Sequence, residues 1–189
     1  FLDQKENRAA IRRYAAGGRV LDCFSNSGGF ALNAALSAES VVAADISPLA
    51  LKNVERNAGL NGIKNIRTVC GDVFSLLREY RAAGEKFSLV VLDPPAFCKS
   101  TAEVQDALRG YKDINIQAMK LIEKGGFLAT CSCSQHMTPT LFERMLAEAA
   151  KESGRRVRCL ETRGQAPDHP VLLNEDETRY LKFYILQVL

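Results

Sequence analysis

Short apolar runs alternate along the chain with longer stretches in which apolar positions recur at helical spacing. Continuous runs rich in Val and Leu and bounded by turn residues are typical of strands that are buried on both faces of a parallel sheet. Such runs predict strands at Arg19–Phe24, Val41–Asp45, Asn65–Cys70, Phe87–Asp93 and Gly126–Cys133. The intervening stretches predict helices between these strands.

Several helix boundaries can be placed from local signals. Pro48 after Ser47 is a favourable start for a helix that continues to Gly59. Further helices are predicted from about Asp3 to Ala15, after Asp72, and from about Pro139 to Ser153, and the segment GYKDIN from Gly110 is expected to open another. Two later apolar segments, at 156–163 and 180–189, read as strands separated by a polar, Pro-containing segment.

The repeated β-α-β order defines the fold class. Parallel strands joined by crossover helices form a sheet with helices on both faces. We therefore predict an α/β, Rossmann-like, doubly wound seven-stranded sheet, mostly parallel with one antiparallel strand near the C-terminus. Ligands of such sheets bind at the carboxyl ends of the strands, so functional residues are expected in the loops that follow them.

Composition narrows the class of protein. A chain of 189 residues with 47% hydrophobic residues is expected to form one globular domain, over 1–189. No apolar run approaches the roughly 20 residues that cross a bilayer, so no membrane partner is expected. The net charge of +3 is a weak argument for nucleic-acid binding, and the cluster GRRVR from Gly154 could contact phosphate or simply be solvated. Six cysteines without a disulfide-like framework or an export signal favour free thiols in the cytoplasm.

Three polar features follow the first three strands. Gly28 and Gly29 would let the backbone approach a ligand closely at the start of a helix. Asp45 could accept hydrogen bonds from both hydroxyls of a ribose, and Asp72 could accept one from an exocyclic adenine amine. Taken alone, a glycine pair is usually only a turn, and each acid is more often a helix cap than a ligand.

The fourth and fifth strands end in residues that carry other chemistry. Asp93 ends the fourth strand, and Pro94 and Pro95 stiffen the loop that follows it. Cys131 and Cys133 lie near the end of the fifth strand and share one face if the strand is regular. Cysteine in a strand is usually a small buried residue, whereas at the strand end its thiolate can act as a nucleophile.

The glycine turn with its two acids resembles the cofactor site of class I S-adenosylmethionine-dependent methyltransferases. More specifically, the chain resembles the catalytic domain of the bacterial 23S ribosomal RNA cytosine-C5 methyltransferase family over nearly its whole length. The motifs that carry this resemblance are, in order, FLDQKENR, CFSNSGGF, VLDPPAFCKS, RGYKDIN, CSCSQHM and QAPDHPV. The family usually has an aromatic residue and Thr where this chain has Asn26 and Ser27.

The resemblance implies a reaction and a set of residues. It implies methyl transfer from S-adenosylmethionine to cytosine C5 in ribosomal RNA, with Cys133 as the nucleophile and Asp93 beside it. It also implies that Asp3 and Arg8 close one side of the cofactor pocket. The residues expected to contact the cofactor are Phe24, Ser25, Asn26, Gly28, Gly29, Asp45, Ile46, Ser47, Asp72, Val73, Asp93 and Pro94. The residues expected to contact the RNA are Pro95, Phe97, Lys112 and His169.

Other functions remain open at this stage. The sequence Asp-Pro-Pro followed by an aromatic residue is similar to the motif of amino-group methyltransferases, although Ala96 intervenes here. The family's N-terminal PUA-type RNA-binding domain is expected to lie outside this sequence, so the chain could also be a cofactor-binding module that needs the missing domain. A homodimer is possible. A zinc site of Cys98, Cys131, Cys133 and His136 would have C-x-C spacing, which fits zinc poorly, so no metal is expected.

Overall fold

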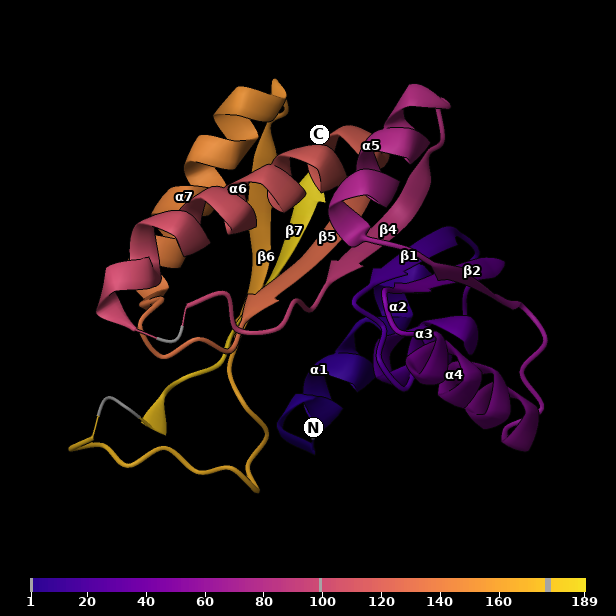
Figure 1. Ribbon diagram of the computed structural model, residues 1–189, viewed down its shortest axis with the longest axis horizontal. Helices are drawn as coiled ribbons and strands as arrows, with labels where there is room; N and C mark the ends of the chain where they lie inside the picture. Colours follow the sequence, from indigo (N-terminus) through magenta and orange to yellow (C-terminus); the bar gives the residue numbers. More distant parts are fainter. Residues whose placement is uncertain (1, 99, 176–177) are drawn as a thin grey trace.

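The computed structural model describes residues 2–98, 100–175 and 178–189. Phe1 and Lys99, which belong to two of the motifs above, lie outside the described residues. Within the described part of the chain, seven strands form one sheet in the order β3-β2-β1-β4-β5-β7-β6 (Figure 1). The strands are β1 (Arg19–Cys23), β2 (Ser40–Asp45), β3 (Ile66–Cys70), β4 (Phe87–Leu92), β5 (Ile122–Ser132), β6 (Val157–Arg163) and β7 (Lys182–Val188).

The pairing of the strands confirms the predicted fold class. Strands β1 to β5 pair in parallel, whereas β7 runs antiparallel to both β5 and β6. The amino end of β7 therefore lies at the same edge of the sheet as the carboxyl end of β5, where Ser132 pairs with Lys182. This places Lys182 and the residues before it next to the loops in which ligand-binding residues are expected.

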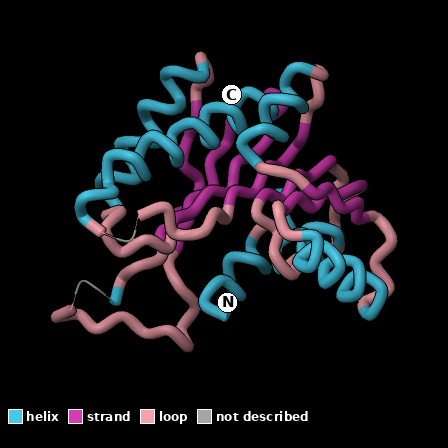
Figure 2. The backbone as a smooth tube through the Cα atoms, in the orientation of Figure 1, coloured by secondary structure: helices cyan, strands magenta, loops and turns pink. Residues whose placement is uncertain are grey.

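Helices cover both faces of the sheet, as Figure 2 shows. Helices α5, α6 and α7 pack on one face around the buried Leu77, Tyr111 and Phe142. The N-terminal helices, α3 and α4 pack on the other face around Ile11, Phe30 and Val54. The helical segments are η1 (Leu2–Gln4), α1 (Lys5–Ala10), α2 (Arg12–Ala15), α3 (Gly29–Ala35), α4 (Pro48–Leu60), α5 (Val73–Ala82), η2 (Thr101–Glu103), α6 (Val104–Leu121) and α7 (Pro139–Ser153).

Two helix predictions need correction. The single helix expected at 3–15 is divided into η1, α1 and α2, with Ile11 between the last two. The segment GYKDIN does not open a helix but lies inside α6, which starts six residues earlier at Val104. The reason is the buried stripe of Ala107, Tyr111 and Ile114, whose spacing continues through Gly110. A Cβ at Gly110 would lie only 3.4 Å from Cδ2 of Phe97, so the glycine lets this ring pack on the helix.

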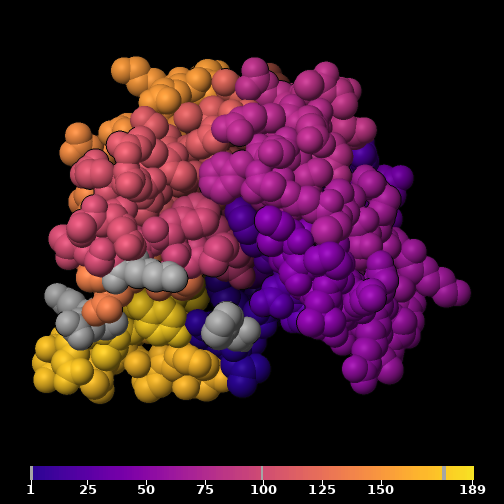
Figure 3. Space-filling model, in the orientation of Figure 1, coloured from indigo at the N-terminus to yellow at the C-terminus, as the bar shows by residue number. Residues whose placement is uncertain are grey.

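The N-terminal segment and the loop between β6 and β7 meet at the carboxyl edge of the parallel strands. The backbone N–H of Ala166 donates to the carbonyl of Asp3 over 2.8 Å, and the Asn7 side-chain amide donates to the carbonyl of Gly164 over 3.1 Å. Figure 3 shows these indigo and yellow-orange segments side by side on one face of the molecule. Together they form one wall over the loops that follow β1, β4 and β5.

Among the described residues, no helix is both long and apolar enough to cross a membrane.

Candidate active site

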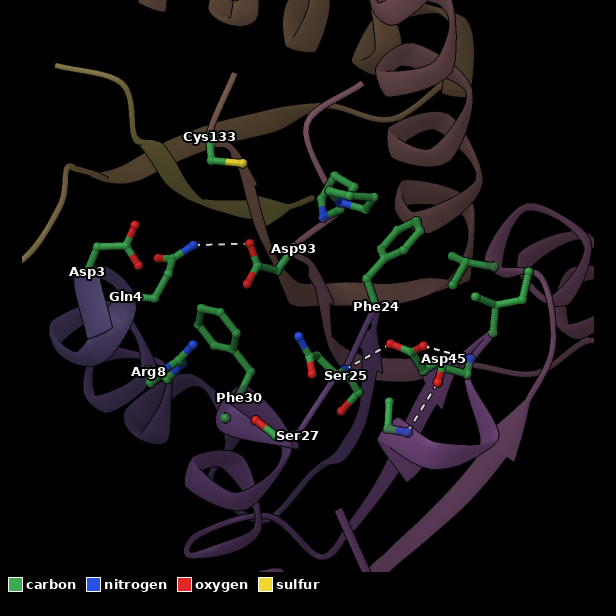
Figure 4. A pocket seen from close by; sticks show the side chains of 18 of the residues that line it. Asp3, Gln4, Arg8, Phe24, Ser25, Ser27, Phe30, Asp45, Asp93 and Cys133 are labelled. Carbon is green, nitrogen blue, oxygen red and sulfur yellow. Dashed lines mark hydrogen bonds between the residues drawn. The ribbon is translucent and has the colours of Figure 1, made fainter. Parts of the chain in front are cut away.

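A cavity of about 780 Å³ lies at the carboxyl ends of β1, β2, β4 and β5. This volume is within the range that holds small-molecule ligands and cofactors. Figure 4 shows most of the side chains that line it. They come from Asp3, Gln4, Arg8, Phe24, Ser25, Asn26, Ser27, Gly29, Phe30, Asp45, Ile46, Ser47, Ala50, Asp72, Val73, Asp93, Pro94, Pro95, Cys133, Tyr180 and Leu181.

The glycine turn after β1 forms the floor of the cavity. Phe24 and Asn26 have positive φ angles of 62° and 49°, a conformation that non-glycine residues rarely adopt and that clusters at functional sites. Gly28 has φ 86° at the start of α3, and a Cβ at Gly29 would lie 2.5 Å from Nε of Arg8. The two glycines therefore allow the tight turn and the close approach of the N-terminal segment.

The buried carboxylate of Asp22 stabilises this turn through hydrogen bonds. Its Oδ2 accepts hydrogen bonds from the Ser25 hydroxyl over 2.6 Å and from the Ala31 backbone N–H over 2.9 Å. Its Oδ1 is buried without a partner. Burial raises the pKa of Asp22 to about 7, and the hydrogen bond from Ser25 opposes that shift. Sequence reasoning missed this residue, although a charged side chain within an otherwise apolar strand was the available signal.

Asp45 joins two of the loops around the cavity. Its Oδ2 accepts from the Asn26 backbone N–H and its Oδ1 from the Ser47 backbone N–H, each over 2.9 Å. Each carboxylate oxygen can accept a further hydrogen bond, and Asp45 lines the cavity. This arrangement can hold the hydroxyls of a ribose. Ile46 next to it is 70% exposed and offers an apolar surface at the cavity mouth.

Asp72 combines the two readings that the sequence left open. Its Oδ2 accepts from the backbone N–H and the hydroxyl of Ser75, both over 3.0 Å, so it caps α5. It also lines the cavity beside the buried Val73. A cap oxygen at the cavity can accept a further hydrogen bond from a ligand.

Asp93 lies where the N-terminal segment meets the ends of β4 and β5. Its Oδ1 accepts from Nε2 of Gln4 over 3.1 Å and from the thiol of Cys131 over 2.9 Å. Burial raises the pKa of Asp93, and the hydrogen bond from Cys131 opposes that shift. Burial also raises the pKa of Cys131 well above its ordinary value, so Cys131 remains a thiol that supports Asp93.

Cys133 follows the last residue of β5 and points into the cavity rather than into the hydrophobic interior (Figure 4). It is only half-buried, whereas Cys131 is 1% exposed and packs in the core. Burial raises the pKa of the Cys133 thiol, and the charge of Asp93 raises it further, whereas Lys182 lowers it. The ground state is therefore a thiol that must lose its proton before it can act as a nucleophile.

Most of the predicted site residues come together at this cavity, but four do not line it. Gly28 is buried behind the turn, where a Cβ would lie 3.2 Å from Cγ1 of Val54. The Phe97 ring packs on Tyr111 with centroids 4.7 Å apart. The two polar residues predicted to contact RNA have partners elsewhere. Lys112 forms an ion pair with Glu152 over 2.9 Å, and Nδ1 of His169 lies 3.2 Å from Oδ1 of Asp168.

Sequence reasoning missed several lining residues. Gln4 lies between Asp3 and Arg8, which were expected, and Phe30 follows the glycine pair. Tyr180 and Leu181 immediately precede β7. The prediction of one antiparallel strand near the C-terminus could have found these two if the last strand had been assigned that role. The amino end of such a strand lies beside the carboxyl ends of its neighbours. Among the residues that the structure describes, no group of three or more His, Cys, Asp or Glu could hold a metal ion.

The strand order and the position of the cavity define a Rossmann-like methyltransferase fold. The whole chain superimposes with a TM-score of 0.89, at 22% identity, on half of SMU.776, a proposed methyltransferase whose crystal structure is a complex with SAH. Trm5b from Pyrococcus abyssi matches 98% of the chain and 49% of its own length with a TM-score of 0.70, also at 22% identity. Identities at this level establish the fold alone.

Residues 7–160 match the model of the family described as "Conserved hypothetical protein 95", and the chain belongs to this family. Over 190 residues it is 46% identical to "Ribosomal RNA large subunit methyltransferase I" of Aeromonas salmonicida, covering 99% of the chain and 48% of that protein. It is 45% identical over 192 residues to the protein of the same name from Erwinia tasmaniensis, covering 100% of the chain and 48% of that protein. The chain thus spans about half the length of the curated relatives it matches.

Proposed function

We propose that this chain is the catalytic domain of an S-adenosylmethionine-dependent methyltransferase that acts on large-subunit ribosomal RNA. Three observations support the proposal: the methyltransferase fold, the names of relatives at 45–46% identity, and a cavity at the carboxyl ends of the parallel strands. The cofactor supplies a methyl group bonded to a positively charged sulfur.

The cavity has polar groups that fit each part of this cofactor. Asp45 would hold the ribose hydroxyls and Asp72 the adenine amine, with the apolar Ile46 beside the adenine ring. At the other end, Oδ1 of Asp3 and Nε of Arg8 are buried without a partner. A carboxylate and a guanidinium of this kind match the ammonium and carboxylate of an amino acid. These residues fit the methionine part of S-adenosylmethionine.

We further propose that the methyl acceptor is C5 of a cytosine and that Cys133 is the nucleophile. The observation that carries this proposal is the position of the Cys133 thiol, which faces the same cavity as Asp93 and the glycine turn. C5 of a neutral pyrimidine is a poor nucleophile, and a thiolate that adds to C6 makes it an enamine-like carbon. Covalent catalysis of this kind suits cysteine because its thiolate is strongly nucleophilic.

The proposed reaction is an addition of Cys133 to the base, followed by methyl transfer and elimination. Cys133 would lose its thiol proton to a neighbouring carboxylate or to water, and its Sγ would form a bond with C6. The electron pair released at C5 would bond to the methyl carbon as the bond from that carbon to the positively charged sulfur breaks, which leaves the sulfur as a neutral thioether. A carboxylate or water then removes the C5 proton, the C5–C6 double bond forms again, and the bond from C6 to Sγ breaks to release the thiolate. Asp93, held by Gln4 and Cys131, is the carboxylate placed to orient the base.

The target base would be flipped out of its helix or lie in a single strand, because C6 is covered by neighbouring bases in a stacked duplex. Transfer to an exocyclic amine, the alternative suggested by Asp93-Pro94-Pro95, would use an aromatic side chain to stack on the base. Phe97, the aromatic residue in this loop, instead packs on Tyr111 and does not line the cavity.

Replacement of Cys133 by Ala tests the assignment. We expect C133A to bind S-adenosylmethionine in calorimetry with an affinity within about twofold of the original, and to lose methyl transfer by at least about 10³-fold. The matched control is Cys159→Ala, because Cys159 is exposed on β6 away from the cavity. Mass spectrometry of nucleosides from the RNA identifies the methylated atom.

A second measurement detects the covalent bond itself. RNA that carries 5-fluorocytidine cannot lose a proton from C5, so the unmutated chain is expected to accumulate a protein–RNA adduct at Cys133, and C133A none. Full methyl transfer by C133A would remove the nucleophile assignment, and N4-methylcytidine as product would favour the amine reaction. Tight cofactor binding without transfer to any large-subunit RNA would contradict the proposed activity and favour a binding module.

A further inference from the structure

Lys182 is a buried lysine beside the Cys133 turn. It is the first residue of β7 and pairs with Ser132 across the sheet. Its side chain is almost fully buried, with 4% of its surface exposed. Its Nζ donates to the carbonyl of Ser134 over 2.5 Å and to the carbonyl of Tyr180 over 2.7 Å. Lys182 thus contacts the chain on both sides of Cys133.

This ammonium has no carboxylate partner among the ion pairs formed by the described residues. Burial of an unpaired charge is costly, and it lowers the pKa of Lys182 to about 8. The lysine nevertheless remains mostly charged at neutral pH. The titratable groups whose negative charge would stabilise it are the thiols of Cys133 and Cys131, and of these only Cys133 faces the cavity.

We propose that Lys182 is a positioning residue for the reaction, whose buried ammonium stabilises the thiolate of Cys133 and fixes the turn that carries it. This inference rests on the proposed role of Cys133 as the nucleophile. A cation beside a neutral thiol gains little, whereas the same cation beside a thiolate in a site of low dielectric constant gains substantially. The fold therefore keeps its unpaired cation where the reaction creates an anion.

The other charged groups around Cys133 oppose the formation of its thiolate, and Lys182 counteracts them. Asp93 at the end of β4 and Asp3 in η1 both raise the pKa of Cys133, and Lys182 is the side chain that lowers it. The remaining titratable neighbours are Cys131 in β5, Tyr111 in α6 and Tyr180 in the last loop. Without Lys182, the charged side chains acting on the thiol would both be acids, and formation of the thiolate would be opposed.

The turn has further supports, so the charge can be removed without removing its framework. The Ser132 hydroxyl bonds to the Tyr111 hydroxyl over 3.0 Å. The Ser134 hydroxyl donates to the carbonyl of Cys98 over 2.6 Å. Both serines are buried. Substitution of Lys182 by Met, an unbranched side chain that is only one heavy atom shorter, is therefore expected to leave the backbone around Cys133 in place.

The test is the pH profile of Cys133 alkylation by iodoacetamide, without RNA, with the modified cysteine located by peptide fragmentation and mass spectrometry. We expect Lys182→Met to raise the apparent pKa of Cys133 by about one unit and to slow its alkylation at pH 7.5 about tenfold. Lys182→Arg, which keeps the charge, should retain most of the reactivity. The exposed Cys159 serves as an internal standard in the same sample.

Lys86→Met is the matched control, because Nζ of Lys86 also donates to a backbone carbonyl, that of Lys120, over 2.8 Å. It should leave the alkylation of Cys133 unchanged. If Lys182→Met does not fold, Lys182→Gln removes the charge and keeps hydrogen-bond donors. An alkylation profile of Cys133 that is the same in the neutral variant and in the original chain overturns the inference.

Measurements of the methyl-transfer rate distinguish a failure of this inference from a failure of the proposed function. Lys182→Met should lower the rate constant for transfer at saturating RNA about tenfold with little effect on cofactor affinity, and raising the pH should restore part of the rate. Slower alkylation with an unchanged transfer rate would overturn the role of Lys182 in the reaction. Full activity of C133A would instead remove the nucleophile itself, and the two failures are therefore distinguishable.

Discussion

At the scale of single residues, Asp22 shows how a buried acid supports the glycine turn. Its Oδ2 binds Ser25 and Ala31, while its Oδ1 has no partner. Burial raises the pKa of Asp22 from 3.8 to about 7. The folded state thus binds this proton more tightly than the unfolded state does. The resulting stabilisation is full below about pH 4 and is lost as the pH rises through about 7.

Asp22→Asn should remove this pH dependence, because the amide keeps an oxygen for Ser25 and Ala31 but does not ionise. We expect the free energy of unfolding of the original chain, relative to that of the variant, to fall by about 2 to 3 kcal/mol between pH 5 and pH 8. Urea unfolding at both pH values measures it. Asp106→Asn, at an exposed site on α6, is the control. If the free energy of unfolding depends on pH equally in the original chain and in Asp22→Asn, the raised pKa of Asp22 is contradicted.

The same scale also shows the surroundings of two residues that are predicted to contact RNA. Lys112 and His169 are the residue types that contact RNA, and each has an aspartate next to it in the sequence, Asp113 and Asp168. Folding brings Glu152 to Lys112 from a different helix, and Asp168 lies beside His169. Their roles in RNA binding stay predictions, and the cavity is built without them.

At the scale of elements, the residues that cap two helices also line the cavity. Ser47 caps α4 and Asp72 caps α5, so each residue ends a strand-to-helix loop at the cavity. Thr138 caps α7 in the same way, with its hydroxyl accepting from the Leu141 backbone N–H over 3.3 Å. Thr138 does not line the cavity. A comparison of substitutions at Asp72 and at Thr138 therefore separates the effect of a cap on stability from its effect on ligand binding.

We expect Asp72→Ala to lower the free energy of unfolding by about 1 kcal/mol through loss of the cap. We also expect it to weaken the binding of S-adenosylmethionine about tenfold, as loss of one hydrogen bond to the adenine amine would do. Thr138→Ala should give a similar loss of stability with unchanged binding. Chemical denaturation and calorimetry measure the two quantities. Equal cofactor affinity in both variants would show that Asp72 is only a cap.

At the scale of the whole molecule, the cavity is closed by segments from opposite ends of the chain. The Tyr180 hydroxyl donates to Oδ2 of Asp3 over 2.8 Å, and Lys5 pairs with Asp168 over 3.0 Å. Both Asp3 and Tyr180 line the cavity. The contact therefore links the position of η1 to the loop before β7.

Tyr180→Phe should loosen this wall and leave the buried carboxylate of Asp3 with one donor fewer. We expect a loss of about 1 to 3 kcal/mol in the free energy of unfolding and about tenfold weaker cofactor binding. Tyr184→Phe is the matched control, because the Tyr184 hydroxyl also donates to a carboxylate, that of Glu143, over 2.7 Å but away from the cavity. If both variants bind the cofactor equally well, the wall does not shape the site.

The order of elements and the loops that carry the chemistry were set by the sequence alone. Apolar runs such as Val41–Asp45 require burial on both faces, and local signals such as Ser47-Pro48 begin helices without help from distant residues. These signals correctly placed Asp45, Asp72, Asp93 and Cys133 at the ends of strands that share one edge of the sheet.

Only the tertiary structure decided which side chains meet across that edge. The environment of Cys133 depends on Asp3, Asp93, Tyr180 and Lys182, which come from three distant parts of the chain. The last two reach Cys133 because β7 pairs antiparallel with β5. The charge and burial of a thiol are properties of its neighbours in space, and no local pattern encodes them. The position of Phe97 likewise depends on neighbours in space. Its ring packs on α6 rather than in the cavity, because Tyr111 provides a ring contact there and Gly110 leaves room for it.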